Sequence, residues 1–172
     1  MSGASVYSAI ERLRDGRLIE IRALRTQDKD DLIRAVGKLS AQSLYRRFFG
    51  VKRHFTNKEI AFFLNIDFTS QVALVAVAEE HDQATIIAGG RYVVTEPGEA
   101  ELAFAVVDQY QGHGIGTLIL THLAKIARQA GITQFVADVL PSNAAMLKVF
   151  EKSGLRRSTK REAGTVHVLL EL

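Results

Sequence analysis

Hydrophobic and polar residues follow two different periods along the chain, and the helical period dominates the first third. Nearly alternating apolar residues predict a first strand at 17–24, because successive side chains of a strand point to opposite faces. Apolar residues at helical spacing then predict two helices, the first capped by Thr26 and the second starting at Ser40. Thr56 and Glu59 match a capping box, which predicts the start of a third, short helix.

From Val72 onward, short β-branched runs alternate with helical patterns. The predicted elements are a hairpin of strands at 72–78 and 85–88, a strand at 101–107, a helix from 115 to about 130, a strand at 134–140, a helix from about 143 to 152, and two strands around the turn at 162–164. This order predicts a mixed α/β fold, in which helices flank a central, mostly antiparallel twisted sheet. No repeat or linker interrupts the pattern, so we expect a single domain over residues 1–172, with its core at about 17–172.

Composition excludes several classes of protein. The 172 residues are 47% hydrophobic and 24% charged, as in a globular domain. No apolar run approaches the roughly 20 residues of a membrane span, and charged residues recur from Glu11 to Arg25, so we expect a cytoplasmic protein. The absence of Cys excludes disulfides and cysteine nucleophiles, and the scattered His residues give no metal-binding spacing, so no metal is expected.

Positive charge is concentrated in the first part of the chain. Residues 1–60 hold 13 basic and 7 acidic residues, whereas residues 61–172 hold 9 and 12. The basic end could face an anionic partner, and its densest part, 46–55, interleaves cations with phenylalanines, as nucleic-acid-binding surfaces do. Such runs are usually the solvated face of a helix, so we do not expect nucleic acid as a partner.

A glycine-rich segment joins a predicted strand to a predicted helix. It reads Gln111-Gly112-His113-Gly114-Ile115-Gly116. Backbone amides and the helix dipole at such a junction can hold a phosphate. The segment lacks the Lys-Ser/Thr of a Walker loop, and its glycine spacing differs from the dinucleotide-binding fingerprint. Two interpretations stay open, a phosphate-binding loop and a tight turn needed only for the strand-to-helix geometry.

The wider sequence context favours the first interpretation. With Tyr110 before it, the pattern Gln-x-x-Gly-x-Gly resembles the pyrophosphate-binding motif of the GNAT superfamily of acyl-CoA-dependent N-acetyltransferases. The segment from Asn143 through Phe150 to Gly154 is similar to a later helix of that superfamily. The segments at 43–49, 66–68, 73–76 and 100–104 look like the catalytic domain of bacterial protein-lysine acetyltransferases.

The resemblance implies a fold, a reaction and a set of site residues. It implies a GNAT-like fold and transfer of an acetyl group from acetyl-CoA to a primary amine, with a protein lysine as the favoured acceptor and a small-molecule amine as the alternative. It implies that backbone groups of Gln111, Gly112, His113, Gly114, Ile115, Gly116 and Thr117 hold the pyrophosphate, that Val106 and Val107 face the acyl carbonyl and pantetheine, and that Asn143 contacts the pantetheine arm. The other interpretation of Asn143 is a helix cap without a ligand contact. Formation of a homodimer stays open.

Glu101 is the candidate general base. An amine has a pKa of about 10.4 and must lose a proton before it attacks a thioester. Glu101 is the only charged residue in the run 100–107, and strand alternation puts it on the face of Ala103 and Ala105, where we expect it to be buried. In the lysine-acetyltransferase resemblance, the glutamate at this position is the base. The alternatives are a solvent-facing strand end, or Glu99 as a substitute base.

The general acid departs from the superfamily pattern. Phe150 stands where these enzymes often carry a tyrosine that protonates the leaving thiolate. Tyr110 and Tyr45 are candidate replacements, although both could be packing or surface residues. Because the chain has no Cys, direct transfer in a ternary complex is expected instead of an acyl-enzyme. The missing tyrosine also motivates another hypothesis, a non-catalytic acyl-CoA-binding module.

Overall fold

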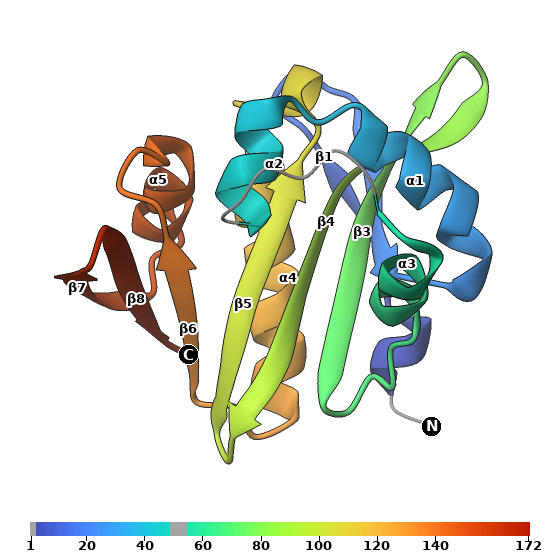
Figure 1. Ribbon diagram of the computed structural model, residues 1–172. Helices are drawn as coiled ribbons and strands as arrows, with labels where there is room; N and C mark the ends of the chain where they lie inside the picture. The colour runs from blue at the N-terminus through green and yellow to red at the C-terminus, as the bar shows by residue number, and fades with distance from the viewer. Residues whose placement is uncertain (1–2, 49–54) are drawn as a thin grey trace.

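The computed structural model describes residues 3–48 and 55–172, which form one eight-stranded sheet with helices on both faces (Figure 1). The helices are α1 (Lys29–Gly37), α2 (Ala41–Phe48), α3 (Asn57–Leu64), α4 (Ile115–Gln129) and α5 (Ala144–Lys152). The strands are β1 (Ser8–Arg12), β2 (Leu18–Ala23), β3 (Gln71–Glu80), β4 (Gln83–Glu96), β5 (Glu99–Val106), β6 (Gln134–Val139), β7 (Arg156–Glu162) and β8 (Thr165–Glu171). None of the described helices is long and apolar enough to cross a membrane.

The predicted mixed α/β fold is confirmed. The strands lie in the order β1-β2-β3-β4-β5-β6-β8-β7, and every neighbouring pair is antiparallel except β5 and β6. The helix α4 packs on β3, β4 and β5 from one face, whereas α1 and α2 pack on β4 and β5 (Figure 1). The central strands are therefore covered on both faces, which buries most of their side chains.

Two strands differ from the prediction. The strand β1 was not predicted because it lacks an apolar face of its own, and Ile10 is 63% exposed. Polar contacts hold the N-terminal segment to α4 instead, since His122 bonds the Tyr7 hydroxyl at 2.5 Å and Glu11 at 2.7 Å. The strand β4 extends over Gln83–Glu96, well beyond the predicted 85–88, and it continues through Gly90. A Cβ at Gly90 would meet Ile119 of α4 at 2.5 Å, so the helix packs directly on this backbone.

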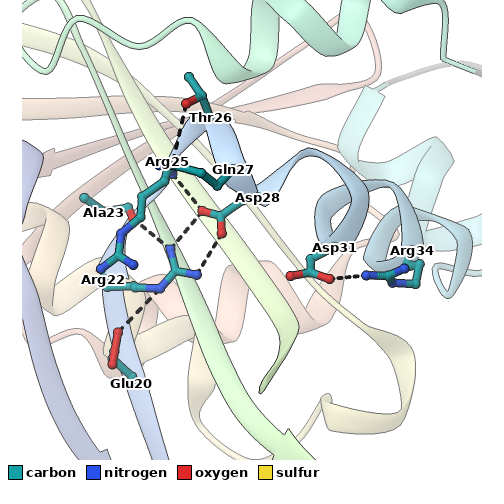
Figure 2. Close-up of polar contacts among 9 residues, drawn as sticks. All are labelled: Glu20, Arg22, Ala23, Arg25, Thr26, Gln27, Asp28, Asp31 and Arg34. Atoms are coloured by element: carbon teal, nitrogen blue, oxygen red, sulfur yellow. Dashed lines mark hydrogen bonds and ion pairs between the residues drawn. The ribbon is translucent and has the colours of Figure 1, made fainter. Parts of the chain in front are cut away.

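The predicted cap of the first helix is wrong. Thr26 belongs to a short 3-10 helix, Thr26–Asp28, and Asp28 is the N-cap residue of α1. Figure 2 shows why the chain turns here: both carboxylate oxygens of Asp28 accept hydrogen bonds at 2.8 Å from Arg22, and one accepts from the Arg25 amide at 2.7 Å. Burial favours a higher pKa for Asp28, but these hydrogen bonds outweigh it and lower the pKa. A threonine hydroxyl cannot accept this set of donors.

The strands β5 and β6 are neighbours over only part of their length. Their parallel pairing joins 99–101 of β5 to 134–136 of β6. Beyond Glu101, β5 is paired only with β4 among the described residues. Figure 1 shows β5 and β6 close together at the bottom of the view and diverging toward the top. The divergence leaves one edge of β5 open. From the end of β5, the chain passes through residues 107–114 to the N-terminal end of α4.

Candidate active site

A groove of about 780 Å³ lies at the open edge of β5. It is lined by Phe104 to Val106 of this strand, by the glycine-rich segment and the first residues of α4, and by α5. The groove therefore brings together three segments that the sequence analysis treated separately. They are the end of the strand, the loop at 111–117 and the helix that Asn143 begins.

Backbone geometry in the glycine-rich segment requires glycine at two positions. Gly112 and Gly114 have φ of 82° and 83°, in the left-handed region that side chains with a Cβ disfavour. Gly114 is the N-cap of α4, and Leu118 donates the first intrahelical hydrogen bond back to its carbonyl. The preceding amides have no carbonyl partner within the helix, and the helix dipole adds positive potential there. This end of α4 is suited to bind an anion.

Positive side chains surround this helix end. The groove lining includes Arg12, Arg14, Arg46, Arg47, Lys148 and Lys152, beside the imidazole of His113. No Asp or Glu lines it in the part of the chain that the structure describes. A cleft lined by one sign of charge concentrates ligands of the opposite sign, so the groove fits a polyphosphate such as the phosphates of CoA.

Most of these cations were not among the predicted ligands. The positive excess in residues 1–60 was the available signal, because Arg12, Arg14, Arg46 and Arg47 all come from that part. Their convergence on the groove needs β1, α2 and the loop at 111–117 to meet in space. The basic run at 46–55 lies partly outside the described residues, and its described Arg46 donates to the Ser142 carbonyl at 3.3 Å.

Backbone groups at the end of β5 differ in their availability. Val107 donates its N–H to Ile87 of β4 at 2.9 Å, and its carbonyl accepts from the Tyr110 amide at 2.8 Å. In a strand, the N–H and C=O of one residue point to the same edge, and those of the next residue point to the opposite edge. Since the Val107 N–H points to β4, the N–H and C=O of Val106 point to the open edge. The Val106 carbonyl accepts from Gln111 Nε2 at 2.9 Å. The Val106 N–H is thus a better candidate than that of Val107 to meet a ligand in the groove.

Asn143 caps the helix α5, which is one of the two roles predicted for it. Its side-chain oxygen accepts from the Met146 amide at 3.2 Å, and the residue is buried. Asn143 also lines the groove, so it lies where a contact with the pantetheine arm was predicted. That contact stays a prediction.

A second cavity of about 1030 Å³ lies under α1, α2 and α3, against β3, β4 and β5. Its walls are mostly aliphatic and aromatic, and its only charged residues within the described ranges are Arg47 and Arg91. Ala105 and Arg47 line both this apolar cavity and the groove. The two spaces therefore meet beside the end of β5.

Glu101 lies on the predicted face of β5, but the expectation that it is buried is wrong. In the sheet, Glu101 lies opposite Val93 and Ala103 lies opposite Arg91. Glu101 is exposed. The apolar cavity begins only at Ala103, so the helices above the sheet leave Glu101 uncovered. Glu101 nevertheless acts on Arg47: burial lowers the pKa of Arg47, and the negative charge of Glu101 opposes that change.

Glu99, Phe150 and the two candidate tyrosines each pack or form hydrogen bonds in the structure. Glu99 accepts hydrogen bonds from Thr95 at 2.9 Å and from Gln134 at 2.6 Å, away from both cavities. Phe150 is buried and packs edge-on against Phe104, with ring centres 5.9 Å apart. The remaining two are tyrosines. The Tyr110 hydroxyl donates to Glu80, and burial raises its pKa, whereas Tyr45 is 46% exposed and lines the apolar cavity.

Residues 38–155 match the family model described as "Acetyltransferase (GNAT) family". Acetyltransferase PA5475 from Pseudomonas aeruginosa is 30% identical over 138 residues, which cover 80% of this chain and 74% of that protein. Acetyltransferase Pat from Mycolicibacterium smegmatis is 30% identical over 145 residues, which cover 83% of this chain. This chain spans less than half of that relative, with 43% of its length covered.

Solved structures show the same similarity. The GNAT domain of S. lividans PAT superposes with a TM-score of 0.88 at 34% identity, and covers 96% of this chain and 97% of that chain. A cAMP-binding acyltransferase from Mycobacterium smegmatis has a TM-score of 0.66 at 26% identity, and covers 98% of this chain and 48% of that chain.

Proposed function

The chain belongs to the GNAT acetyltransferase family and is an N-acetyltransferase, and we propose that it moves the acetyl group of acetyl-CoA to a lysine of a protein. The observation that carries the proposal is the groove itself. The open edge of β5, the N-terminal end of α4 and a set of cations without an opposing carboxylate all line one space. This combination matches the two ends of an acyl-CoA, one a thioester and the other phosphorylated.

The phosphorylated end of the co-substrate fits the helix end of the groove. Backbone amides from Gly112 to Thr117 are the candidates to hold the pyrophosphate, with Arg and Lys side chains around them. Asn143 and the free edge of β5 would border the pantetheine arm. The thioester would then lie near Ala105, where the groove meets the apolar cavity.

At the thioester, the Val106 N–H would stabilise the charge that develops on the carbonyl oxygen. A fixed backbone donor lowers the barrier because it needs no reorganisation as the oxyanion forms. The ammonium first loses one proton to Glu101, and the amine nitrogen then bonds to the carbonyl carbon. The bond from this carbon to sulfur breaks, so CoA leaves as a thiolate. The nitrogen loses its second proton to water, and water supplies a proton to the thiolate, since the Tyr110 hydroxyl donates to Glu80.

Glu101 would act through water. A strand rises about 3.3 Å per residue, so the Cα atoms of Glu101 and Ala105 are roughly 13 Å apart. One or more water molecules must bridge the carboxylate and an amine bound beside Ala105. The exposure of Glu101 gives water access to this path. Among the described residues, neither cavity has a lining carboxylate that could replace it.

A protein lysine suits the apolar cavity as acceptor. The four methylene groups of a lysine side chain are apolar, and the cavity walls next to Ala105 are mostly apolar too. The segments at 43–49, 66–68, 73–76 and 100–104, which look like protein-lysine acetyltransferases, support the same acceptor class.

The test is to incubate the protein with isotope-labelled acetyl-CoA and a cell extract, and to follow the label into protein and small-molecule fractions by mass spectrometry. A parallel reaction with Glu101→Gln corrects for non-enzymatic acetylation. Label on specific lysines that depends on Glu101 supports the proposal. Label confined to metabolites would move the function to small amines, and no label in either fraction, with CoA bound, would favour a binding module.

A second measurement tests direct transfer. Intact protein is incubated with acetyl-CoA without an acceptor, and its mass is measured. We expect an unchanged mass. A covalent acetyl adduct that passes to an added acceptor would contradict direct transfer.

A further inference from the structure

Arg91 is an arginine of the apolar cavity whose hydrogen-bonding capacity is only partly used. Its Nη2 donates to the Phe63 carbonyl at 3.2 Å, and its guanidinium carbon lies 4.8 Å from the centre of the Phe63 ring. Its Nη1 is buried and has no hydrogen-bond partner among residues 3–48 and 55–172. A guanidinium has five N–H donors in a planar fork. The donors of Nη1 therefore remain for a ligand.

The charge of Arg91 is also uncompensated within the cavity. Burial, followed by the positive charge of Arg47, lowers the pKa of Arg91 to about 10, so Arg91 remains charged at neutral pH. Arg47 lines the same cavity, and the described lining residues include no Asp or Glu. Glu101, which acts on Arg47, is exposed and lies outside the lining. A cavity that holds two cations and apolar walls is favourable for an anion that enters it.

We propose that Arg91 forms a carboxylate-binding subsite of the apolar cavity, where Arg47 adds positive potential. The inference rests on the proposed acyl transfer and narrows its acceptor to a lysine that has an Asp or Glu nearby in the substrate protein. Arginine forks bind carboxylates through paired hydrogen bonds, and the apolar walls around them exclude water that would weaken the attraction. The subsite would position the acceptor, while Glu101 takes its proton.

A purely structural role for Arg91 predicts something different. Its contacts with Phe63 hold α3 to the sheet, and their loss would affect all acceptors alike. A carboxylate subsite affects only acceptors that carry a carboxylate. The ratio of activities on paired acceptors therefore separates the two roles.

The experiment uses lysine peptides in which a single Glu, or a Gln in its place, is moved through the positions around the lysine. The wild-type protein is expected to show a kcat/KM at least about tenfold higher for Glu than for Gln at one or more positions, since close charge pairs are worth at least this factor. In Arg91→Gln the ratio should fall below about twofold, because the charge and the fork are both lost.

Two further variants guard against misfolding and general charge effects. Arg91→Lys keeps the charge without the planar fork, and should retain part of the preference. Arg157→Gln removes an exposed arginine of β7 that lines neither cavity, and should leave the ratio unchanged. Thermal unfolding and CoA titration show whether each variant folds.

The outcomes separate this inference from the proposed function. Acetylation of the peptides with no Glu preference, or with a preference that persists in Arg91→Gln, overturns the subsite while leaving lysine transfer standing. If no peptide is acetylated, amino acids are compared with the same amines lacking the carboxylate. A carboxylate preference there that Arg91→Gln removes supports the subsite on a small acceptor, and its absence overturns it.

Discussion

The two cavities that meet at Ala105 and Arg47 differ in how they are built. The groove is positively charged, with backbone amides of the segment 111–117, the open edge of β5 and cations from β1, the turn after it, α2 and α5. The other cavity is apolar, with walls from α1 to α3 and two cations in them. In the proposed function, the groove would bind groups that any acyl-CoA shares, whereas the apolar cavity offers few groups and would select by shape and charge. We therefore expect co-substrate binding and acceptor choice to be separable by mutation.

The largest expected effect concerns the chemical step between the two cavities. Glu101→Gln should lower kcat by about 10²–10⁴-fold, the usual contribution of a general base. CoA affinity should stay within about twofold, because Glu101 lines neither cavity. Steady-state kinetics and calorimetric titration measure the two quantities. A kcat that is nearly unchanged would rule out Glu101 as the base.

Loss of the Asp28 ion pair should disturb α1 and the apolar cavity that this helix lines, and should leave the groove unchanged. Asp28→Asn removes the carboxylate that binds the half-buried Arg22 at the start of α1, and should lower the free energy of unfolding by about 3 kcal/mol. Urea unfolding measures the change, and the folded variant should bind CoA normally. Asp31→Asn, which breaks only the exposed pair with Arg34 shown in Figure 2, should lower it by less than about 1 kcal/mol.

The same pair predicts a dependence on pH. The pKa of Asp28 is lower in the folded protein than its ordinary value of about 3.9. Its contribution is therefore fully present above that value, and is lost as the pH falls through the folded pKa. Asp28→Asn should remove this part of the acid destabilisation. Parallel unfolding curves for both proteins down to acid pH would contradict the assignment.

A change in the glycine-rich segment should affect the groove alone. Gly114→Ala forces a Cβ into the left-handed region, at a strain of about 1–2 kcal/mol, and should weaken CoA binding roughly tenfold. Gly131→Ala is the matched control, since Gly131 has the same φ of 83° and no atom within 4 Å of an added Cβ, as at Gly114. It should destabilise the fold similarly and leave CoA affinity intact. Equal losses of affinity would argue against a phosphate contact.

The smallest effect is expected from a single groove cation. Lys152→Gln should raise the Kd for CoA roughly threefold at low salt, and less at high salt, because ions screen the attraction. Lys125→Gln makes the same charge change on an exposed position of α4 outside both cavities. It should leave the Kd unchanged. Titrations at two salt concentrations provide the comparison, and identical behaviour of both variants would exclude a local role for Lys152.

The sequence determined the features that depend on neighbouring residues. Three features depend on φ preferences and hydrogen bonds within a few residues. They are the helix α4, the glycine conformations of its N-terminal segment and the Asn143 cap of α5. The same local rules predicted the order of most strands and helices, and hence the fold class. They failed at β1, whose contact with α4 spans more than 100 residues.

Tertiary structure alone decided what surrounds those local features. The exposure of Glu101 follows from where α1 to α3 lie over the sheet. The Val106 N–H faces an open edge because β5 and β6 diverge. Arg91 and Arg47 come from a strand and a helix that are distant in sequence, yet both line one cavity. Burial and electrostatic potential are sums over all nearby groups, so no local pattern specifies them.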